Sequence, residues 1–254
     1  MLVAGCNTDI QAPKALNFVH SQALVDDIEQ LITSEVRHLD ACNTLANLAC
    51  DFRHTEAVFI EVNTPDAIND SLELLKHIRL FNQAACIFIL VTHNKSFTSI
   101  NHYLAGADHC IKLPVDPLEK QALLSRTFEE SHWLTNTRLT LDRTRLLLCS
   151  ATSKIEISYT EMTIIDALAK APQHVLSQDS IAKTLDPNIV FYDPRALEKT
   201  ISRLRTKIKK AYNLELIFSV RAFGYRLRRG TITGKYQFKQ QLHALLSRPL
   251  QFTD

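Results

Sequence analysis

A basic amphipathic segment near the C-terminal end, residues 195–210, is the feature that most limits what this chain can fold into. It holds seven Lys or Arg residues and a single acidic one. Apolar residues recur in it at helical spacing and predict one helix face packed against a core: Leu197, Ile201, Leu204 and Ile208. The opposite face is basic and polar. A second basic segment, residues 218–227, predicts two short β-strands that meet at a turn near Gly224.

Together the two segments resemble a known DNA-binding family. A basic helix beside a basic hairpin can hold DNA, with one element in each groove. Residues 197–208 and 219–227 resemble the V-D-V-H-I-x-R-L-R-x-K-L helix and the T-V-R-G-x-G-Y-R-F/L hairpin of OmpR/PhoB-type bacterial response regulators. Upstream, residues 157–161 resemble the family's L-T-x-x-E helix start, and residues 175–178 resemble its v-l-S-R step into the next helix. These matches imply a winged helix-turn-helix domain of the α+β class.

The resemblance also implies which residues contact DNA. Thr200 stands where relatives have His, and Ser202 is often a basic or polar residue in relatives, so the base preference cannot be inherited. Arg221 is retained, which suits insertion into a narrow minor groove. Alternatively, the charged face of this helix contacts only solvent. The match of the whole domain favours contact with DNA. The predicted DNA-contacting residues are Arg195, Lys199, Thr200, Ser202, Arg203, Arg205, Thr206, Ser219, Arg221 and Tyr225.

Charge is divided unequally between the two halves of the chain. The chain has 254 residues, a length that predicts two domains. Its net charge is only +2. Residues 1–125 hold 8 Lys and Arg against 15 Asp and Glu, a balance of −7, whereas residues 126–254 hold 21 against 12, a balance of +9. An acidic half joined to a basic half indicates that only the second half meets a polyanion.

Strand and helix patterns alternate along the first half. Residues 8–20 are expected to be irregular. Strands are expected at 1–6, 57–62, 85–91 and 110–113, and helices at 22–34, 70–80, 96–105 and 117–133. Such alternation predicts a parallel α/β sheet. Residues 106–119 resemble the G-A-D-D-Y-I-T-K-P-F-D-P-x-E segment of a receiver domain, which implies a doubly wound, flavodoxin-like α/β fold.

The second half predicts short strands followed by three helices and the hairpin. The helices are expected at 160–170, 178–185 and 193–210. The predicted organisation is a receiver-like domain at 1–125, a linker at 126–136, a winged-helix domain at 137–230 and a C-terminal extension at 231–254.

The receiver resemblance implies a phosphorylation site whose usual residues are largely missing. The phospho-acceptor position, four residues before Pro65, falls on Glu61, and the switch position falls on Thr92. The Lys position falls on Leu113, while Lys112 lies one place early, which points it to the other face of a strand.

The acidic pair of this site is missing as well. The expected first strand ends at Cys6 without the two carboxylates that hold Mg²⁺, a hard cation that prefers oxygen ligands. We therefore expect a pseudo-receiver that works without phosphorylation, with no cofactor and no metal. The alternative is that Asp26-Asp27, although inside a helical pattern, supplies the acidic pair.

Two further groups of side chains could form sites. His38, Cys42, Cys50 and His54 have a symmetric spacing that could bring His and Cys ligands together, but structural zinc sites usually hold tighter Cys pairs. Core cysteines with surface histidines are the favoured interpretation. A thiol redox switch is also open, although the cysteines lack an adjacent basic cluster to lower the thiol pKa. The six cysteines are Cys6, Cys42, Cys50, Cys86, Cys110 and Cys149.

Other functional classes find little support. There is no run of 18 apolar residues, no secretory pattern and no C-x-x-C, so we expect a cytoplasmic protein without a membrane span. Ser-His-Asp, Cys-His and Gly-rich phosphate-loop patterns are missing too, and we expect no enzyme.

The predicted function is sequence-specific regulation of transcription, independent of phosphorylation. The implied partners are double-stranded promoter DNA, a second copy of the chain and RNA polymerase. The family's dimer ion pairs are not expected, because their positions fall on His109, Leu123 and Ser125; apolar surface at Leu123 and Leu124 is expected to replace them. Two alternatives remain: a phosphorylation-responsive regulator with an unusual pocket, and an interaction protein whose receiver-like half binds another regulator.

Overall fold

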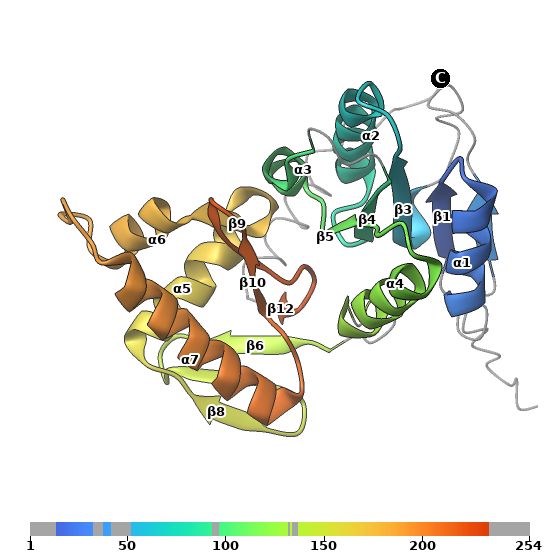
Figure 1. Ribbon diagram of the computed structural model, residues 1–254. Helices are drawn as coiled ribbons and strands as arrows, with labels where there is room; N and C mark the ends of the chain where they lie inside the picture. The colour runs from blue at the N-terminus through green and yellow to red at the C-terminus, as the bar shows by residue number, and fades with distance from the viewer. Residues whose placement is uncertain are drawn as a thin grey trace, which may run out of the picture. The chain divides into compact units, whose positions relative to one another are not determined.

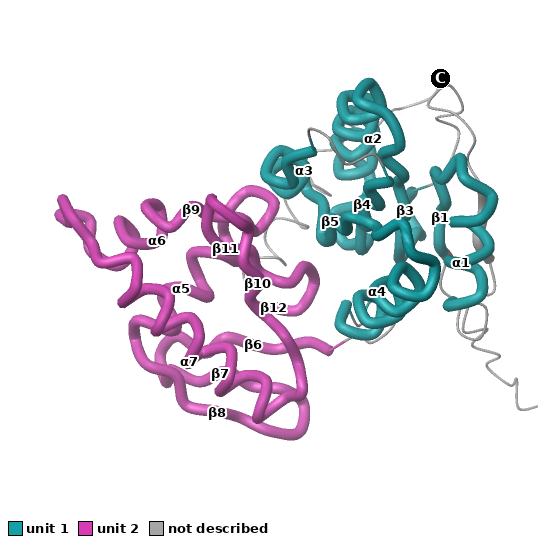
Figure 2. The backbone as a smooth tube through the Cα atoms, in the orientation of Figure 1, with its two compact units in different colours: residues 1–135 teal, residues 136–254 magenta. Residues whose placement is uncertain are grey.

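The computed structural model describes residues 14–32, 38–41, 52–92, 97–131, 133 and 137–233, and the strand expected at residues 1–6 lies outside them. The chain divides into two compact units, residues 1–135 and 136–254 (Figure 2). In the described residues, unit 1 has one sheet with an apolar core on each face, and unit 2 has two sheets and one apolar core.

Unit 1 is built on a five-stranded parallel sheet with the order β2-β1-β3-β4-β5. Its strands are β1 (Lys14–Phe18), β2 (His38–Ala41), β3 (Thr55–Val62), β4 (Cys86–Val91) and β5 (His109–Lys112). This is the order of the flavodoxin-like doubly wound fold, and the predicted fold class is confirmed. The central strands β3 and β4 are nearly continuous apolar runs because both of their faces are buried.

Helices cover both faces of this sheet (Figure 1). On one face, apolar side chains of α1 and α4 share a core with Phe59 and Phe88. On the other, α2 and α3 cover a second core that contains Val58 and Ile60. A short 3₁₀ turn, η1, leads into β3. The helical elements are α1 (Gln22–Ile32), η1 (Phe52–His54), α2 (Ala67–Phe81), α3 (Ser99–Ala105) and α4 (Pro117–Ser131).

The expectation of irregular structure before residue 20 is wrong for Lys14–Phe18, which forms β1. This strand has five residues and includes the polar Asn17, so its apolar signal is too short to distinguish from a loop. Its place is set instead by pairing with β2 on one side and β3 on the other. Because both partners are distant in sequence, local periodicity could not reveal it.

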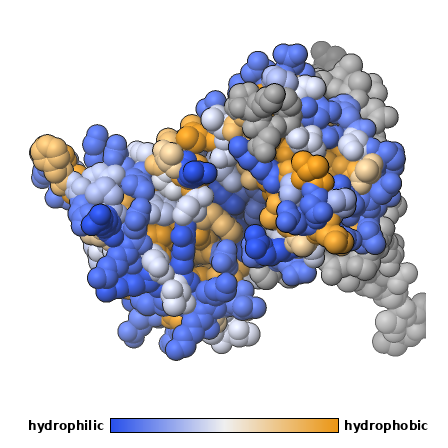
Figure 3. Space-filling view, viewed as in Figure 1, coloured by the Kyte–Doolittle hydropathy of each residue, from blue (hydrophilic) through white to orange (hydrophobic). Residues whose placement is uncertain are grey.

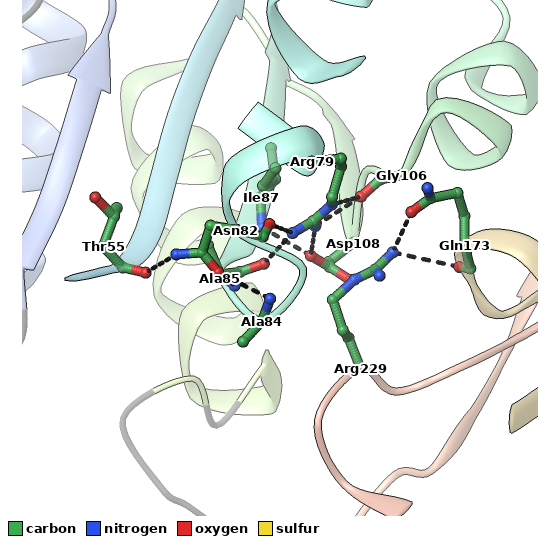
Figure 4. Close-up of polar contacts among 10 residues, drawn as sticks. All are labelled: Thr55, Arg79, Asn82, Ala84, Ala85, Ile87, Gly106, Asp108, Gln173 and Arg229. Carbon is green, nitrogen blue, oxygen red and sulfur yellow. Dashed lines mark hydrogen bonds and ion pairs between the residues drawn. The ribbon is translucent and has the colours of Figure 1, made fainter. Parts of the chain in front are cut away.

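A buried ion pair joins the end of α2 to the neighbouring strands (Figure 4). Arg79 Nη2 lies 2.7 Å from Asp108 Oδ2, and the two side chains are almost completely buried. The guanidinium also donates to the carbonyl oxygens of Gly106, Asn82 and Ala85 at 2.7–3.2 Å. Asp108 Oδ2 accepts the backbone N–H of Ile87 at 2.8 Å. This network fixes the start of β4 and the turn before β5.

A fully buried histidine holds α3 against α2. His102 Nε2 lies 2.9 Å from Ser71 Oγ, and its ring contacts Phe97. Burial lowers the pKa of His102 to about 4. The imidazole is therefore neutral near pH 7, and its role is packing and hydrogen bonding.

Unit 2 contains two small sheets and three α-helices in the described residues. The four-stranded sheet has the order β12-β6-β7-β8, and the three-stranded sheet has the order β10-β11-β9. One apolar core lies between these sheets and the helices. In chain order the elements are β6 (Leu139–Asp142), β7 (Leu147–Cys149), β8 (Lys154–Glu156), α5 (Tyr159–Lys170), η2 (Pro172–His174), β9 (Val175–Ser177), α6 (Gln178–Leu185), α7 (Pro194–Tyr212), β10 (Ile217–Val220), β11 (Gly224–Leu227) and β12 (Ile232–Thr233).

Two of the expected domain limits, at 125/126 and 230/231, differ from the structure. The linker expected at 126–136 overlaps α4, which continues to Ser131 because Leu124 and Phe128 pack into the core of unit 1. The extension expected from residue 231 begins inside unit 2, where Ile232–Thr233 pairs with β6 as β12. The remainder of that extension, residues 234–254, lies outside the described residues.

Candidate nucleic-acid interface

The basic helix of the sequence is α7, and its ends carry clear start and stop residues. Asp193 precedes it, and its side chain accepts the backbone N–H of Arg195 at 2.9 Å. Pro194 occupies the first helical position, where a missing N–H costs no hydrogen bond. Asn213 ends the helix in the left-handed region, with φ of 49°.

One face of α7 is apolar and the other is basic and polar, as the spacing of its residues predicts. Its apolar stripe is buried in the core of unit 2. The opposite face is solvent-exposed and presents Arg195, Lys199, Ser202, Arg203 and Thr206. The surface over this helix is largely hydrophilic in the space-filling view (Figure 3). Such a stripe of cations and short polar groups suits a groove lined by phosphates.

The predicted hairpin is the β10–β11 pair, which forms a wing next to the start of α6. Ser219 and Arg221 are exposed on it. β11 also pairs with β9, with Gly224 opposite Ser177. A Cβ on Gly224 would meet the backbone of Leu176, Ser177 and Gln178, so only glycine permits this close approach. The wing is thereby held to α6.

Two predicted contact residues instead link α7 to the wing. Arg205 is half-buried; its Nε donates to the carbonyl of Ile217 at 2.8 Å and its Nη2 to Ser219 Oγ at 3.0 Å. Its guanidinium lies over the Tyr225 ring, 5.6 Å from the centroid. Burial lowers the pKa of Arg205 and raises that of Tyr225. Tyr225 is buried in the core rather than presented on the surface, so these two side chains fix the angle between helix and wing.

Two threonines also make local bonds. Thr200 is half-buried, and its Oγ1 donates to the carbonyl of Ala196 at 2.9 Å. Thr206 Oγ1 donates to the carbonyl of Ser202 at 3.0 Å but stays on the exposed face. Of the ten predicted DNA-contacting residues, the structure therefore exposes seven together: Arg195, Lys199, Ser202, Arg203, Thr206, Ser219 and Arg221.

In unit 1, Glu61 is the residue predicted to occupy the phospho-acceptor position of a receiver. It lies near the C-terminal end of β3, beside β1, where doubly wound sheets bind ligands. One carboxylate oxygen, Oε2, accepts the backbone N–H groups of His20 and Ser21 at 2.8 and 3.0 Å. The other, Oε1, accepts the hydroxyl of Thr92 at 3.1 Å. Glu61 is thus buried and bonded through both oxygens.

The described loop between β1 and α1, residues 19–21, holds no acidic residue. β1 ends at Phe18, and His20-Ser21, rather than a pair of acids, precede α1. The strand that was expected to end at Cys6 lies outside the described part of the chain. Leu113 is buried and Lys112 is exposed, as the one-residue shift predicted.

The alternative acidic pair lies elsewhere. Asp26 and Asp27 are within α1, where Asp27 forms an ion pair with Lys120 of α4 at 2.6 Å. Asp26 accepts a hydrogen bond from Gln22 on the surface. Neither residue is in the loop that follows β1, so the structure contradicts a role for this pair in the Glu61 site.

The other groupings gain no support from the described residues. His38 lies in β2, not on a helix, and Cys42 and Cys50 lie outside the described part of the chain. Across the ranges that the structure describes, no three His, Cys, Asp or Glu residues gather as metal ligands would. None of the helices in these ranges combines the length and apolar composition that crossing a membrane requires.

Comparison with known proteins agrees with both units. Residues 152–227 match the family model described as "Transcriptional regulatory protein, C terminal". The transcriptional regulatory protein PhoP of Escherichia coli K12 is 25% identical over 175 residues, which cover 67% of this chain and 78% of PhoP. The response regulator MprA of Mycobacterium sp. strain KMS is 28% identical over 199 residues, which cover 75% and 83%. These sequence matches support an OmpR/PhoB-type response regulator.

Solved structures of response regulators are also similar to this OmpR/PhoB-type regulator. DrrB of Thermotoga maritima, described as an OmpR/PhoB homolog, is 15% identical, with a TM-score of 0.40; the match covers 85% of this chain and 99% of DrrB. The regulator described here is a DNA-binding transcriptional regulator.

Sequence reasoning missed two features of these sites. The backbone N–H groups of His20 and Ser21 carry no sequence signal, because every residue except proline has one. Glu198 is the single acid of α7, and the basic pattern around it gives no sign of a separate role for its carboxylate.

Proposed function

We propose that this OmpR/PhoB-type regulator binds specific double-stranded DNA through α7 and the β10–β11 wing, without phosphorylation of unit 1. The observation that carries the proposal is the Glu61 carboxylate, which is already bonded to the α1 N-terminus and to Thr92. The exposed basic stripe of α7 supports the DNA part. Its Lys and Arg side chains would neutralise phosphates, while short polar side chains between them approach base edges.

Replacing Arg203 with alanine is expected to weaken binding to the specific site by about 1–3 kcal/mol, or to relax preference at one base pair. The fold should be unaffected, because Arg203 is exposed on the polar face. Titration of the full chain against its selected site at several salt concentrations measures the effect. Arg145→Ala is the matched control: this exposed arginine lies in the turn between β6 and β7. Equal affinities for the wild type and Arg203→Ala would refute the assignment of α7.

The Glu61 site supports independence from phosphorylation. A receiver that accepts a phosphoryl group needs a nucleophilic carboxylate and further carboxylates that hold Mg²⁺. Here both Glu61 oxygens already accept hydrogen bonds: one accepts two backbone N–H groups, and the other accepts the Thr92 hydroxyl. The bond to Thr92 holds the switch residue in place, as a phosphoryl oxygen would.

Acetyl phosphate with Mg²⁺ is therefore expected to leave the protein unlabelled. The Glu61→Asp variant restores an aspartate but not an acidic pair after β1, so it should remain unlabelled too. Intact-mass measurement detects the added phosphoryl group. A labelled wild-type protein would instead support the phosphorylation-responsive alternative, and labelling of Glu61→Asp alone would show that the remaining pocket is competent.

We also propose that the protein associates into a homodimer, through a surface other than the one predicted at Leu123 and Leu124. Leu123 is half-buried against the core of unit 1, and Leu124 is fully buried, so neither forms the apolar surface that the sequence predicted. The exposed apolar residues near this helix are instead Leu118, 77% exposed, and Val115, 100% exposed. Leu104 of α3 is 45% exposed.

We expect a dimer that persists in high salt, since apolar contacts are not screened as ion pairs are. Leu118→Glu should shift the protein to monomer in light scattering at micromolar concentration. Leu80→Glu is the matched control, because Leu80 of α2 is equally exposed, at 79%. A monomeric wild type, or a dimer that Leu118→Glu leaves intact, would contradict this surface.

RNA polymerase is the remaining proposed partner. The segment between α6 and α7 exposes Val190 at 82% and Phe191 at 91%, and Figure 3 shows hydrophobic atoms at its tip. Apolar side chains exposed to this extent suit contact with another protein. Replacing both with serine should preserve DNA binding but lower transcription reconstituted with RNA polymerase; loss of DNA binding itself would assign the segment to the fold.

A further inference from the structure

Glu198 stands among cations on the face of α7 that we assign to DNA. It is exposed in the second turn of the helix, three positions after Arg195 and four before Ser202. Residues at these spacings are neighbours on a helix surface. Glu198 therefore belongs to the exposed stripe, in the N-terminal half of the helix.

Two acids that face α7 from other parts of unit 2 are bonded to its lysines, and Glu198 is not. Glu161 of α5 accepts Lys207 at 2.8 Å, and Glu215 accepts Lys209 at 3.5 Å. Within residues 137–233, as far as the structure describes them, Glu198 has neither a hydrogen bond nor an ion pair. Its charge acts on Tyr225: burial is the main cause of the raised pKa of Tyr225, and Glu198 is the second. Glu198 therefore lies on the side of α7 that faces the wing.

A free carboxylate on this surface has an electrostatic cost when DNA binds. Phosphates repel it, and removal of its water must be compensated by a hydrogen-bond donor. The N-terminal residues of a recognition helix reach base edges in the major groove. There, guanine presents only acceptors and thymine an acceptor and a methyl group, whereas adenine places an acceptor beside its amine. Cytosine presents its N4 amine, a donor that suits a carboxylate.

We propose that Glu198 is a specificity-determining residue that accepts a hydrogen bond from the N4 amine of one cytosine. This inference rests on the proposed binding of DNA through α7. Glu198 would then have two effects. Its carboxylate strengthens binding to one base pair, and it repels every duplex that lacks cytosine at that position. Discrimination by a repulsive group is a general way to obtain specificity.

The test is selection of binding sites from a random duplex pool with the full-length wild type and two variants. Glu198→Ala should lose one cytosine preference, by about tenfold at that position, and should bind random duplex more tightly than the wild type. Glu198→Gln should move the preference toward adenine, because an amide pairs with the adenine N6 and N7 atoms. Glu156→Gln removes the same charge from an exposed position on β8 and should leave the selected motif unchanged.

The outcomes separate the inference from the proposed function. A wild type that selects no motif would overturn sequence-specific binding itself, and this inference with it. A wild type that selects a motif shared unchanged by Glu198→Ala and Glu198→Gln would overturn the role of Glu198 alone. Equal gains in non-specific affinity from Glu156→Gln and Glu198→Ala would show a general charge effect and overturn the role too.

Discussion

Arg79→Met is expected to destabilise unit 1 by about 3–5 kcal/mol, the usual effect of removing one partner from a buried ion pair. The methionine keeps apolar bulk but supplies no donors. The carboxylate of Asp108 would then be buried without its 2.7 Å partner, and the carbonyls of Gly106 and Ala85 would lose theirs. The start of β4 and the turn before β5 should loosen first.

Urea unfolding followed by fluorescence measures this loss, because Trp133 is the single tryptophan and packs against the core of unit 1. Lys76→Met on the same helix is the control. Its ion pair with Glu73 is 2.8 Å long but largely exposed, at 59% and 72%, so its loss should cost no more than about 1 kcal/mol. Arg79→Met with Asp108→Asn should be more stable than Arg79→Met alone, since no uncompensated charge remains. Similar stability losses for Arg79→Met and Lys76→Met would contradict the argument.

Gly224→Ala is expected to detach the wing from α6 and to abolish specific DNA binding. The added Cβ would press on the carbonyl oxygen of Leu176 and lie 2.8 Å from Ser177 Cα and 2.9 Å from Gln178 N. All of these are backbone atoms, so no side chain can rotate away. The strand pair must separate, at a cost of about 3 kcal/mol or more.

Hydrogen exchange reports this separation directly. The amide of Gln178, which donates to the carbonyl of Phe223 at 3.1 Å, should lose its protection. Gly230→Ala is the control: nothing lies within 4 Å of its added Cβ, and only its φ of +71° is unfavourable, which costs about 1 kcal/mol. It should retain protection at Gln178 and DNA binding. Full protection at Gln178 in Gly224→Ala would show that the wing tolerates the methyl group.

Features with a strong local period were predictable from the sequence. The spacing of Leu197, Ile201 and Leu204 defined both faces of α7 before any packing was known. The same holds for Lys112 and Leu113, since successive residues of a strand point to opposite faces. Motif resemblance supplied the winged-helix and receiver-like folds, and the order of the five parallel strands agrees with the latter.

Features that depend on distant partners were not predictable. β1 was missed because its pairing with β2 and β3, not its five-residue sequence, defines it. The helical pattern predicted that Leu123 lies on the surface. In the structure α4 packs on the sheet, and Leu123 is half-buried against the core. Arg205 and Tyr225 were predicted as DNA contacts, but partners on β10 and β11 leave Arg205 half-buried and Tyr225 buried.

The sequence by itself determined the acidic and basic halves, the amphipathic α7 and the residue types at Glu61 and Leu113 on which the predicted pseudo-receiver depends. Each of these is a property of residue type and spacing along one segment. Only the tertiary structure decided that Glu61 bonds to the N–H groups of His20 and Ser21, and that Arg79 is neutralised by Asp108. The physical reason is that a buried polar group is stable only beside a partner, and folding, not sequence proximity, supplies that partner.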